Sequence, residues 1–599
     1  MKWIIRTWIA CSIFISYSFC SEKNNLPEVL GRVCAFGDFN GDRQNDILVS
    51  RNGNLTVKLQ ETKLLDLMEG PRFIDSTSWN IADEDPGTNI ECSVGDFNGD
   101  GLLDVLVSIR LDDKKYNHTL YTAHADRSGF FPFHVGVFVQ HAVTVDVTND
   151  GWYDILAFYP NGSFYCSTVS QTGRINLIFN DCTNEFIAFP AVTNVYEGMP
   201  HFFVDINSDL RAELVFMTKG DDGSLIMSVW QQVKMGWTYR DWIPKLSSAQ
   251  YQYVGAPLTA DFDADGEMDI LVPICREADC LHVTSLAAYS YNRKWSRPSI
   301  AIDMQDLEVQ SEPNSKVLFR IGDFSLDTYP DLIAILVNRQ QSKVVRSTRV
   351  LENVKCVNCE KNDTRKFEIK VTEYVQTKNM SLGTPKMSTF FDLLEDGNLE
   401  LLIEYEFDKT TRFGFLKEAQ KGDTTFLKVQ IFTGLCGPSC LPHIHNNASI
   451  GLAGSCAQYS MTDGWGGSAR SMACQVPSSS YRSLFLPFIL FGLGRSPNFV
   501  DELNVAVPRY AENKEDWRHT LKQIVPNSRL IILPPTGAYS HWITTLYVTP
   551  SQLVLQSLGV MASVCMMLLI VVVFLHYREK KEDRYERQQQ SHRFHFDAM

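Results

Sequence analysis

The 599-residue chain lacks the short motifs of two large classes of hydrolase. It contains no His-Glu-x-x-His, with which many metalloproteases hold zinc, and no Gly-x-Ser-x-Gly, the turn that presents a nucleophilic serine. Gly492-Leu-Gly494 lacks the third glycine of a dinucleotide-binding turn. His443 and His445 could share one strand face, but two imidazoles do not complete a metal site. These absences argue against an enzyme, and we expect no catalytic residue.

An excess of positive charge is also absent. The chain has 55 Lys and Arg residues against 70 Asp and Glu residues, a formal net charge of −15 at pH 7. Proteins that bind nucleic acid neutralise its phosphates with Lys and Arg. We therefore expect no nucleic-acid partner.

The acidic residues are concentrated in seven copies of one nine-residue pattern. Each copy has acidic residues at positions 1, 5 and 9 and is followed at once by an apolar run, as in Asp38-Phe-Asn-Gly-Asp-Arg-Gln-Asn-Asp-Ile-Leu-Val. The copies open at Asp38, Asp96, Asp146, Asp205, Asp261, Asp323 and Asp392, which are 50 to 69 residues apart. Such a period is typical of a repeat architecture in which each unit is one supersecondary element.

Alternate oxygens in a tight loop can surround a hard cation such as Ca²⁺, which takes six to eight oxygen ligands. Positions 1, 3, 5 and 9 offer side-chain oxygens, and position 7 offers its backbone carbonyl. The candidate metal ligands are Asp38, Asn40, Asp42, Gln44, Asp46, Asp96, Asn98, Asp100, Leu102, Asp104, Asp146, Thr148, Asp150, Trp152, Asp154, Asp205, Asn207, Asp209, Arg211, Glu213, Asp261, Asp263, Asp265, Glu267, Asp269, Asp323, Ser325, Asp327, Tyr329, Asp331, Asp392, Asp396, Asn398 and Glu400.

The seven copies are not equivalent. The loop from Asp261 to Asp269 has the most carboxylates, so we expect the strongest calcium binding there. In the loop from Asp392 to Glu400, Leu394 brings no side-chain oxygen at position 3, so we expect the weakest binding. A turn without metal is the alternative, since Asp, Asn and Gly favour turns. Turn propensity alone does not require three carboxylates within nine residues at seven regular places.

An EF-hand begins similarly but ends with a bidentate Glu at position 12 on a following helix. Position 12 is apolar in all seven copies here: Val49, Val107, Ala157, Phe216, Val272, Ala334 and Ile403. Runs such as Asp269-Ile-Leu-Val-Pro indicate buried strands, so each loop joins two strands. We predict an all-β fold with a seven-bladed β-propeller over residues 28–450, because a blade of four strands fits this period.

Segments outside the repeats predict a membrane protein. Residues 1–20, with Lys2 and Arg6 before an apolar stretch, have the pattern of a secretory signal peptide. Residues 553–575 carry no charge and are long enough to cross the lipid bilayer as a helix. The basic tail, 576–599, is then cytoplasmic by the positive-inside rule. We predict a single-pass type I protein of the plasma membrane; whether the ectodomain is also shed stays open.

The part of the chain ahead of the span has the features of a protein in an oxidising, extracellular compartment. Residues 451–550 have several strand-like runs, for which we predict a small membrane-proximal β-sandwich. Twelve cysteines lie between the signal and the span, and we expect local disulfides in three close pairs: Cys275–Cys280, Cys356–Cys359 and Cys436–Cys440. Predicted glycosylation sites are Asn54, Asn117, Asn161, Asn362, Asn379 and Asn447.

Two resemblances follow from these motifs. Gly37-Asp-Phe-Asn-Gly-Asp and Gly95-Asp-Phe-Asn-Gly-Asp-Gly resemble the calcium loops of FG-GAP repeats in integrin α-subunits. The segment Phe491-Gly-Leu-Gly-Arg-Ser-Pro-Asn-Phe-Val500 and the terminal Ser591-His-Arg-Phe-His-Phe-Asp-Ala-Met599 resemble the T-cell immunomodulatory protein family, also called linkin, and this similarity runs end to end. The chain differs from integrin α-subunits in two ways. About 100 residues separate the repeats from the span, too few for an integrin leg, and no Gly-Phe-Phe-Lys-Arg follows the span.

The family resemblance implies a cell-surface adhesion or immune-modulating role with an unidentified extracellular protein ligand. It also implies contacts of the tail with RuvB-like ATPases and tubulin. Two alternatives stay open. One is an ectoenzyme with phospholipase-like activity, because one phospholipase D that cleaves glycosyl-phosphatidylinositol anchors carries similar repeats. The other is a calcium-sensing switch, which needs loop affinities within the range over which external calcium varies.

Overall fold

In the computed structural model, each of the seven acidic loops joins two consecutive strands that pair antiparallel, and the seven pairs belong to seven different sheets. The strand that follows each loop is buried along most of its length; β21 (Asp269–Cys275), for example, is buried throughout. A continuous apolar run is typical of a strand covered on both faces. The run after each acidic loop therefore fills the space between neighbouring sheets, and the all-β prediction is confirmed.

The structure describes residues 26–548 and 552–596 except 62–70, 82–89, 112–114, 160–162, 173–175, 188–194, 221, 235, 247–250, 291–292, 297–299, 303–306, 313–314, 341–342, 357–364, 371–373, 378, 419–423, 436–449, 463–465, 477–479, 496–497, 509–516 and 536–540. The predicted signal peptide lies outside these residues.

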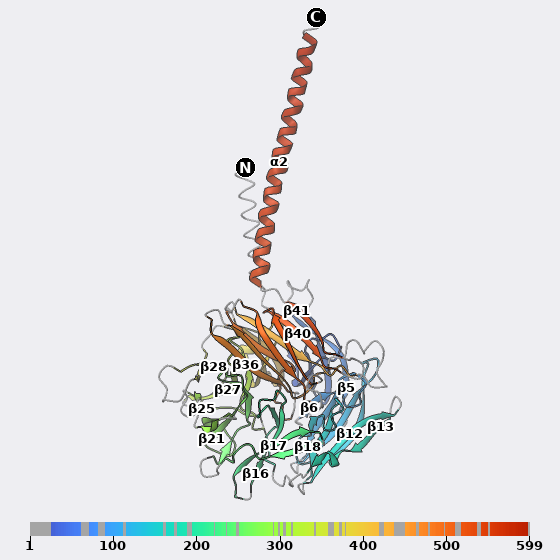
Figure 1. Ribbon diagram of the computed structural model, residues 1–599, viewed down its shortest axis with the longest axis vertical. Helices are drawn as coiled ribbons and strands as arrows, with labels where there is room; N and C mark the ends of the chain where they lie inside the picture. The colour runs from blue at the N-terminus through green and yellow to red at the C-terminus, as the bar shows by residue number, and fades with distance from the viewer. Residues whose placement is uncertain are drawn as a thin grey trace. The chain divides into compact units, whose positions relative to one another are not determined.

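The first four loop-bearing sheets, which run from blue to green in Figure 1, lie in the N-terminal part of the array. They have four or five strands each. Their strands are β2 (Arg32–Gly37), β3 (Asp46–Arg51), β4 (Asn54–Glu61) and β5 (Arg72–Asn80); β6 (Ile90–Gly95), β7 (Asp104–Arg110), β8 (Tyr116–Ala123) and β9 (Phe130–Phe138); β10 (Val143–Val145), β11 (Asp154–Phe158), β12 (Phe164–Thr172) and β13 (Asn176–Asp181); and β14 (Phe186–Ile187), β15 (Phe202–Val204), β16 (Glu213–Lys219), β17 (Leu225–Val233) and β18 (Gly236–Arg240). A short 3-10 helix, Thr183–Glu185, precedes β14.

The last three loop-bearing sheets have five or six strands each. Their strands are β19 (Tyr253–Val254), β20 (Leu258–Ala260), β21, β22 (His282–Ser290), β23 (Arg293–Ser296) and β25 (Leu307–Glu308); β24 (Ile300–Ile302), β26 (Arg320–Gly322), β27 (Asp331–Gln340), β28 (Lys343–Lys355) and β29 (Arg365–Ile369); and β1 (Val29–Leu30), β30 (Tyr374–Gln376), β31 (Thr384–Phe391), β32 (Glu400–Phe407) and β33 (Thr410–Glu418). A 3-10 helix, Met380–Leu382, precedes β31.

The first described strand closes the array. β1 precedes the first sheet in the chain but pairs with β33 of the last, with Val29 opposite Phe413. The backbone of Gly31 also donates a 2.9 Å hydrogen bond to the carbonyl of Thr411. The first and last repeats are therefore neighbours, and β1 pairs with an edge of β33.

Two further sheets form the C-terminal sandwich. One has the order β37 (Ile489–Gly494), β34 (Thr425–Ile431), β40 (Ser528–Leu533), β41 (Ile543–Val548); the other has the order β36 (Ser468–Gln475), β35 (Ser455–Thr462), β38 (Val500–Ala506), β39 (Arg518–Ile524). Apolar side chains from both sheets share one core, which includes Leu427, Tyr459 and Ile532. β34 lies ahead of residue 450 in the chain, yet its hydrogen-bonding neighbours β37 and β40 are both in the sandwich.

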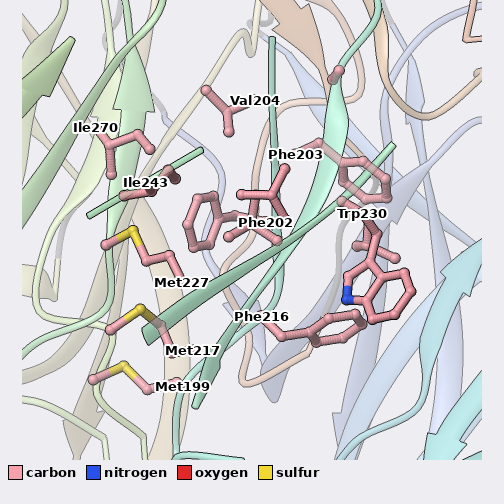
Figure 2. Packing of buried hydrophobic residues seen from close by; sticks show 14 of the residues in the cluster. Met199, Phe202, Phe203, Val204, Phe216, Met217, Met227, Trp230, Ile243 and Ile270 are labelled. Atoms are coloured by element: carbon pink, nitrogen blue, oxygen red, sulfur yellow. The ribbon is translucent and has the colours of Figure 1, made fainter. Parts of the chain in front are cut away.

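The largest core cluster extends over several consecutive sheets. Figure 2 shows part of it, where side chains of β15, β16 and β17 pack together. Trp230 on β17 is fully buried there, and Trp237 on β18 is 2% exposed. The sandwich contributes Cys456 and Met472 to this same cluster. The repeat array and the sandwich are thus packed into one unit, residues 1–547.

Residues 548–599 form a second unit. It contains α2 (Gln552–Phe596), whose segment from Ser557 is long and apolar enough to cross a membrane. The predicted span, 553–575, lies within this helix. One apolar C-terminal helix of this kind indicates a single-pass membrane protein.

Disulfides link segments within single sheets and, at Cys34–Cys92, two successive sheets. Cys275–Cys280 is formed as predicted, and Cys34–Cys92, Cys166–Cys182 and Cys456–Cys474 are formed as well. Cys356 is also disulfide-bonded. Cys359 and the predicted pair Cys436–Cys440 lie outside the described residues.

Candidate metal-binding loops and the surface that covers them

All seven acidic loops share one network of hydrogen bonds. The backbone N–H groups of positions 5 and 6 donate to the carboxylate of position 1 over 2.6–3.3 Å. The N–H of position 7 donates to the carboxylate of position 5. The N–H of position 2 donates to the carboxylate of position 9. The three acidic positions are therefore held by the backbone of their own loop.

This network needs an unusual backbone. Positions 4 and 6 have positive φ in every loop, for example 57° at Ala264 and 82° at Gly266. The left-handed conformation costs a residue with a Cβ roughly 1–2 kcal/mol, and β-branched Thr328, at φ 88°, is an extreme case. Glycine does not occur at every one of these positions. The shared hydrogen bonds, rather than residue preference alone, impose the conformation.

In every loop the carboxylate of position 9 is buried, whereas that of position 5 is exposed in the first and third loops, at Asp42 and Asp150. In the fifth loop, one oxygen each of Asp261, Asp263 and Asp265 lie within 4.8 Å of one another. Burial, reinforced by the neighbouring carboxylates, raises the pKa of Asp261 to about 7 and that of Asp154 in the third loop to about 8. The cause is the cost of placing like charges together away from water. A bound cation would remove that cost.

The donor set fits calcium in chemistry: carboxylate, amide and hydroxyl oxygens at alternate positions. The sixth loop provides a further sign, because the buried hydroxyl oxygen of Ser325 at position 3 has no hydrogen-bond partner within the described part of the chain. Buried polar atoms rarely lack a partner. Asp323, Ser325 and Asp327 would hold the ion there, and the first five loops would use the same positions.

Position 3 differs among the loops. The Asn40 side-chain oxygen accepts a hydrogen bond from the N–H of Asp42 over 2.9 Å, so it is turned into the loop. In the third loop Thr148 instead donates to Asp154 over 3.3 Å. In the fourth loop the predicted position-7 residue Arg211 places its guanidinium 2.8 Å from Asp209. The side chain of Arg211 thus adds positive charge to a loop in which its carbonyl was the expected ligand.

The C-terminal sandwich lies against the acidic loops. The N–H of Met472 on β36 donates to Asp261 over 3.2 Å, and the N–H of Gly492 on β37 donates to Asp323 over 3.0 Å. Lys428 on β34 forms an ion pair with Asp392 at 2.9 Å. Tyr153, beside the third loop, donates to the carbonyl of Gly451 over 2.7 Å. The loops are therefore an interface within the molecule, which residue patterns within one repeat did not predict.

A second contact joins the sandwich to the centre of the array. Between β36 and β37, residues Ser480–Leu484, which we call the axial segment, touch residues of many sheets. Arg482 forms ion pairs of 2.6 Å with both Glu312 and Glu404, and donates to the carbonyl of Val33 over 2.9 Å. A segment that reaches so many members of a closed array lies near its middle.

The ion pairs of the axial segment are largely buried: the side chains of Arg482 and Glu404 are 2% and 5% exposed and that of Glu312 is 13% exposed. Burial alone would raise the pKa of Glu312, but Arg482, Arg32 and Arg320 lower it to about 2. Tyr481 packs its ring 4.5 Å from that of His141, and Ser480 lies 3.2 Å from His201. Tyr481, Arg482 and Leu484 all have positive φ. The segment is thus held in a strained conformation by contacts on every side.

The predicted glycosylation sites differ in exposure. Asn54 is exposed at the start of β4, whereas Asn117 and Asn379 are half-buried. The side-chain nitrogen of Asn379 donates to Glu28 over 2.8 Å. Asn161, Asn362 and Asn447 lie outside the described residues.

Comparison with known proteins agrees with this architecture. A family model described as "FG-GAP-like repeat" matches residues 38–107, which contain the first two acidic loops. A model described as "ITFG1, C2 domain" matches residues 447–547, most of the sandwich. The chain is 59% identical to protein linkin of Caenorhabditis elegans, over 98% of each chain. It is 28% identical to human T-cell immunomodulatory protein, over 96% of this chain and 93% of that one, and 27% identical to the rat protein over the same shares.

Proposed function

The chain belongs to the linkin and T-cell immunomodulatory protein family, and from this premise we propose that it is a calcium-stabilised adhesion or receptor protein of the cell surface. The observation that carries the proposal is the shared backbone network that directs carboxylates inward in all seven acidic loops. Calcium in such loops would stiffen the array without any chemical step. The proposal assigns no catalytic residue.

The membrane arrangement in this proposal follows from charge. α2 continues beyond its apolar part into Arg578, Lys580 and Lys581, and basic residues favour the cytoplasmic side. The repeats and the sandwich are then extracellular, at the plasma membrane. There they would meet a protein ligand on another cell or, as the names of the mammalian relatives suggest, act on T cells.

The surface offered to that ligand is limited by the sandwich. The strand ends that carry the acidic loops are contacted by β34, β36 and β37. The opposite strand ends include the partly exposed apolar residues Leu111, after β7, and Tyr159, after β11. Exposed apolar and aromatic side chains are common anchors of protein interfaces. We therefore place the ligand-binding surface at the strand ends away from the acidic loops.

Calcium titration of the full-length protein in lipid nanodiscs tests the proposal that the acidic loops bind calcium. We expect several bound ions by calorimetry and a rise in melting temperature, and Asp261→Asn should bind fewer ions than the wild type. If calcium neither binds nor stabilises the protein, the loops are turns without a metal and the calcium proposal is wrong.

A cell-aggregation assay tests the proposed adhesion and the location of the ligand-binding surface. Cells that display the full-length protein should adhere to partner cells in calcium and lose adhesion in a calcium chelator. Replacement of both Leu111 and Tyr159 by Ser should weaken adhesion while calcium binding is retained. Equal adhesion by this double variant would place the ligand-binding surface elsewhere.

A further inference from the structure

The seventh acidic loop has the same backbone as the other six but different side chains. Asp396 N–H and Gly397 N–H donate to Asp392, as in every copy. Position 3, however, is Leu394, and position 4 is Glu395, where the other loops have uncharged residues. Glu395 is 7% exposed and adopts φ 52°. One oxygen ligand is lost, and a buried carboxylate is added.

A lysine from outside the repeats reaches this loop. The ammonium of Lys428, on β34, lies 2.9 Å from Asp392 and 2.5 Å from Glu395. The Lys428 side chain is 1% exposed and that of Asp392 is fully buried. The ring of Phe488 lies 4.0 Å from the same ammonium. A buried ammonium with two carboxylates at hydrogen-bond distance is a built site for a positive charge.

Neighbouring groups complete the arrangement around Glu395. Both the backbone and the side-chain nitrogen of Asn45 donate to Glu395, over 3.1 and 2.8 Å. The guanidinium of Arg529, on β40, lies 3.6 Å from Glu395. Asn45 belongs to the first acidic loop and Arg529 to the sandwich. Three parts of the molecule therefore meet at one buried carboxylate.

We propose that Lys428 takes the place of a metal ion in the seventh loop, so that this loop binds no calcium while the remaining loops do. The inference rests on the proposed function, since it presupposes that the other loops bind calcium. Its physical basis is charge. A calcium ion held by Asp392 would lie a few ångströms from a lysine ammonium in a buried site, where repulsion between like charges is much stronger than in water.

The presence of Lys428 in place of a metal ion changes what holds the sandwich against the array. At the fifth and sixth loops, backbone N–H groups of the sandwich bind aspartates that also face a metal site. At the seventh loop, the sandwich supplies the cation itself, through its own strand β34. The seventh loop is then a contact between array and sandwich that does not depend on calcium.

The number of calcium ions bound by the full-length protein in nanodiscs tests whether the seventh loop lacks a calcium ion. The protein is equilibrated with 1–2 mM calcium, on the order of extracellular affinities, and bound ions are counted by plasma mass spectrometry after dialysis. Three chains are compared: wild type, Asp392→Asn and Asp261→Asn. We expect Asp392→Asn to retain the wild-type count and Asp261→Asn to lose one ion.

The outcomes separate the two proposals. If the wild type binds no calcium, the calcium proposal itself fails. If Asp261→Asn and Asp392→Asn each lose one ion, calcium binding stands but the seventh loop is an ordinary site and the role of Lys428 is refuted. Should Asp392→Asn fail to fold, as judged by its melting curve, Lys428→Met replaces it. A gain of one ion in Lys428→Met then supports the inference, and an unchanged count overturns it.

Discussion

The axial segment depends on the charge of a few residues. Arg482 is 2% exposed and faces Glu312 and Glu404, while Arg32 also pairs with Glu312 at 2.7 Å. Buried ion pairs add little stability compared with a well-packed apolar group, but removal of one partner leaves a charge uncompensated. The guanidinium of Arg482 also satisfies the carbonyl of Val33. Removal of the Arg482 guanidinium therefore takes a partner from both carboxylates and from the backbone carbonyl.

We expect Arg482→Met to lower the free energy of unfolding by about 3–5 kcal/mol, since Glu404 loses its 2.6 Å partner in a buried site and Glu312 keeps only Arg32 and Arg320. Chemical denaturation followed by tryptophan fluorescence would measure this. Lys386→Met is the matched control: Lys386 pairs with Glu406 at 2.9 Å, but both side chains are more than 40% exposed. Such a pair contributes about 0–1 kcal/mol. Comparable losses in the two variants would mean that the axial segment carries no special share of stability.

Two buried histidines predict loss of stability in acid. Burial lowers the pKa of His118 and of His201 to about 3, so both are neutral in the folded protein. In the unfolded chain their pKa returns to about 6.5. The unfolded state therefore binds more protons below pH 6.5, and this stability is lost as the pH falls from about 6.5 towards 3.

Between pH 7 and pH 5, each histidine should remove about 2 kcal/mol of stability at constant saturating calcium. The double variant His118→Gln, His201→Asn should flatten this part of the pH dependence, as measured by denaturation at several pH values. His282→Gln is the control, because its hydrogen bond to Glu277 raises the pKa of His282 and its effect has the opposite sign. An unchanged slope in the double variant would assign the acid sensitivity to other groups.

At the scale of elements, β37 approaches the sixth loop too closely for a side chain. A Cβ on Gly492 would lie 2.2 Å from a carboxylate oxygen of Asp323 and 2.3 Å from the backbone of Leu326. Gly492 belongs to the Phe-Gly-Leu-Gly segment on which the family resemblance was recognised. The glycine thus permits the close contact between sandwich and loop.

We expect Gly492→Ala to displace β37 from the sixth loop and to lower the melting temperature by several degrees, as overpacking costs about 1–3 kcal/mol. Hydrogen exchange should rise at β37 and at the loop from Asp323 to Asp331. Gly466→Ala serves as the control: its Cβ would meet nothing within 4 Å, so only the strain of its φ of 83° is added. Equal exchange at the sixth loop in both variants would count against the docking role.

The sequence predicted those elements whose signal is local. The acidic loops, the buried strand after each and the Cys275–Cys280 disulfide were all predicted from spacing, and the structure contains them. Cys34 and Cys92 occupy the same place in consecutive repeats, but their pairing depends on how adjacent sheets meet. Lys428 was missed because, in Phe426-Leu-Lys-Val-Gln-Ile431, it reads as the outward residue of an alternating strand.

The axial segment could not be predicted for a similar reason. Ser480-Tyr-Arg-Ser-Leu484 reads as a polar connection between strands. Its partners Val33, Glu312 and Glu404 lie more than 75 residues away in the chain. They come together only after the array has closed through β1 and β33.

At the scale of the whole molecule, array and sandwich are joined at the loops, at the axial segment and in a shared core. Cooperative unfolding as one unit follows, since the sandwich cannot leave without exposing Lys428, Asp392 and Arg482. Calcium should stabilise this whole unit. With a dissociation constant near 0.1 mM, 1 mM calcium adds about 1.4 kcal/mol for each site that only the folded state forms.

We therefore predict one calorimetric transition for the array and the sandwich in the full-length protein, and a shift of that entire transition to lower temperature when calcium is chelated. The seventh loop makes the prediction sharper, because its lysine keeps sandwich and array together without metal. Lys428→Met should remain a single transition in calcium but split into two in chelator, while Lys522→Met, in an exposed pair with Glu502, should not split. Two transitions in the wild type, in calcium, would show that the sandwich and the array unfold independently.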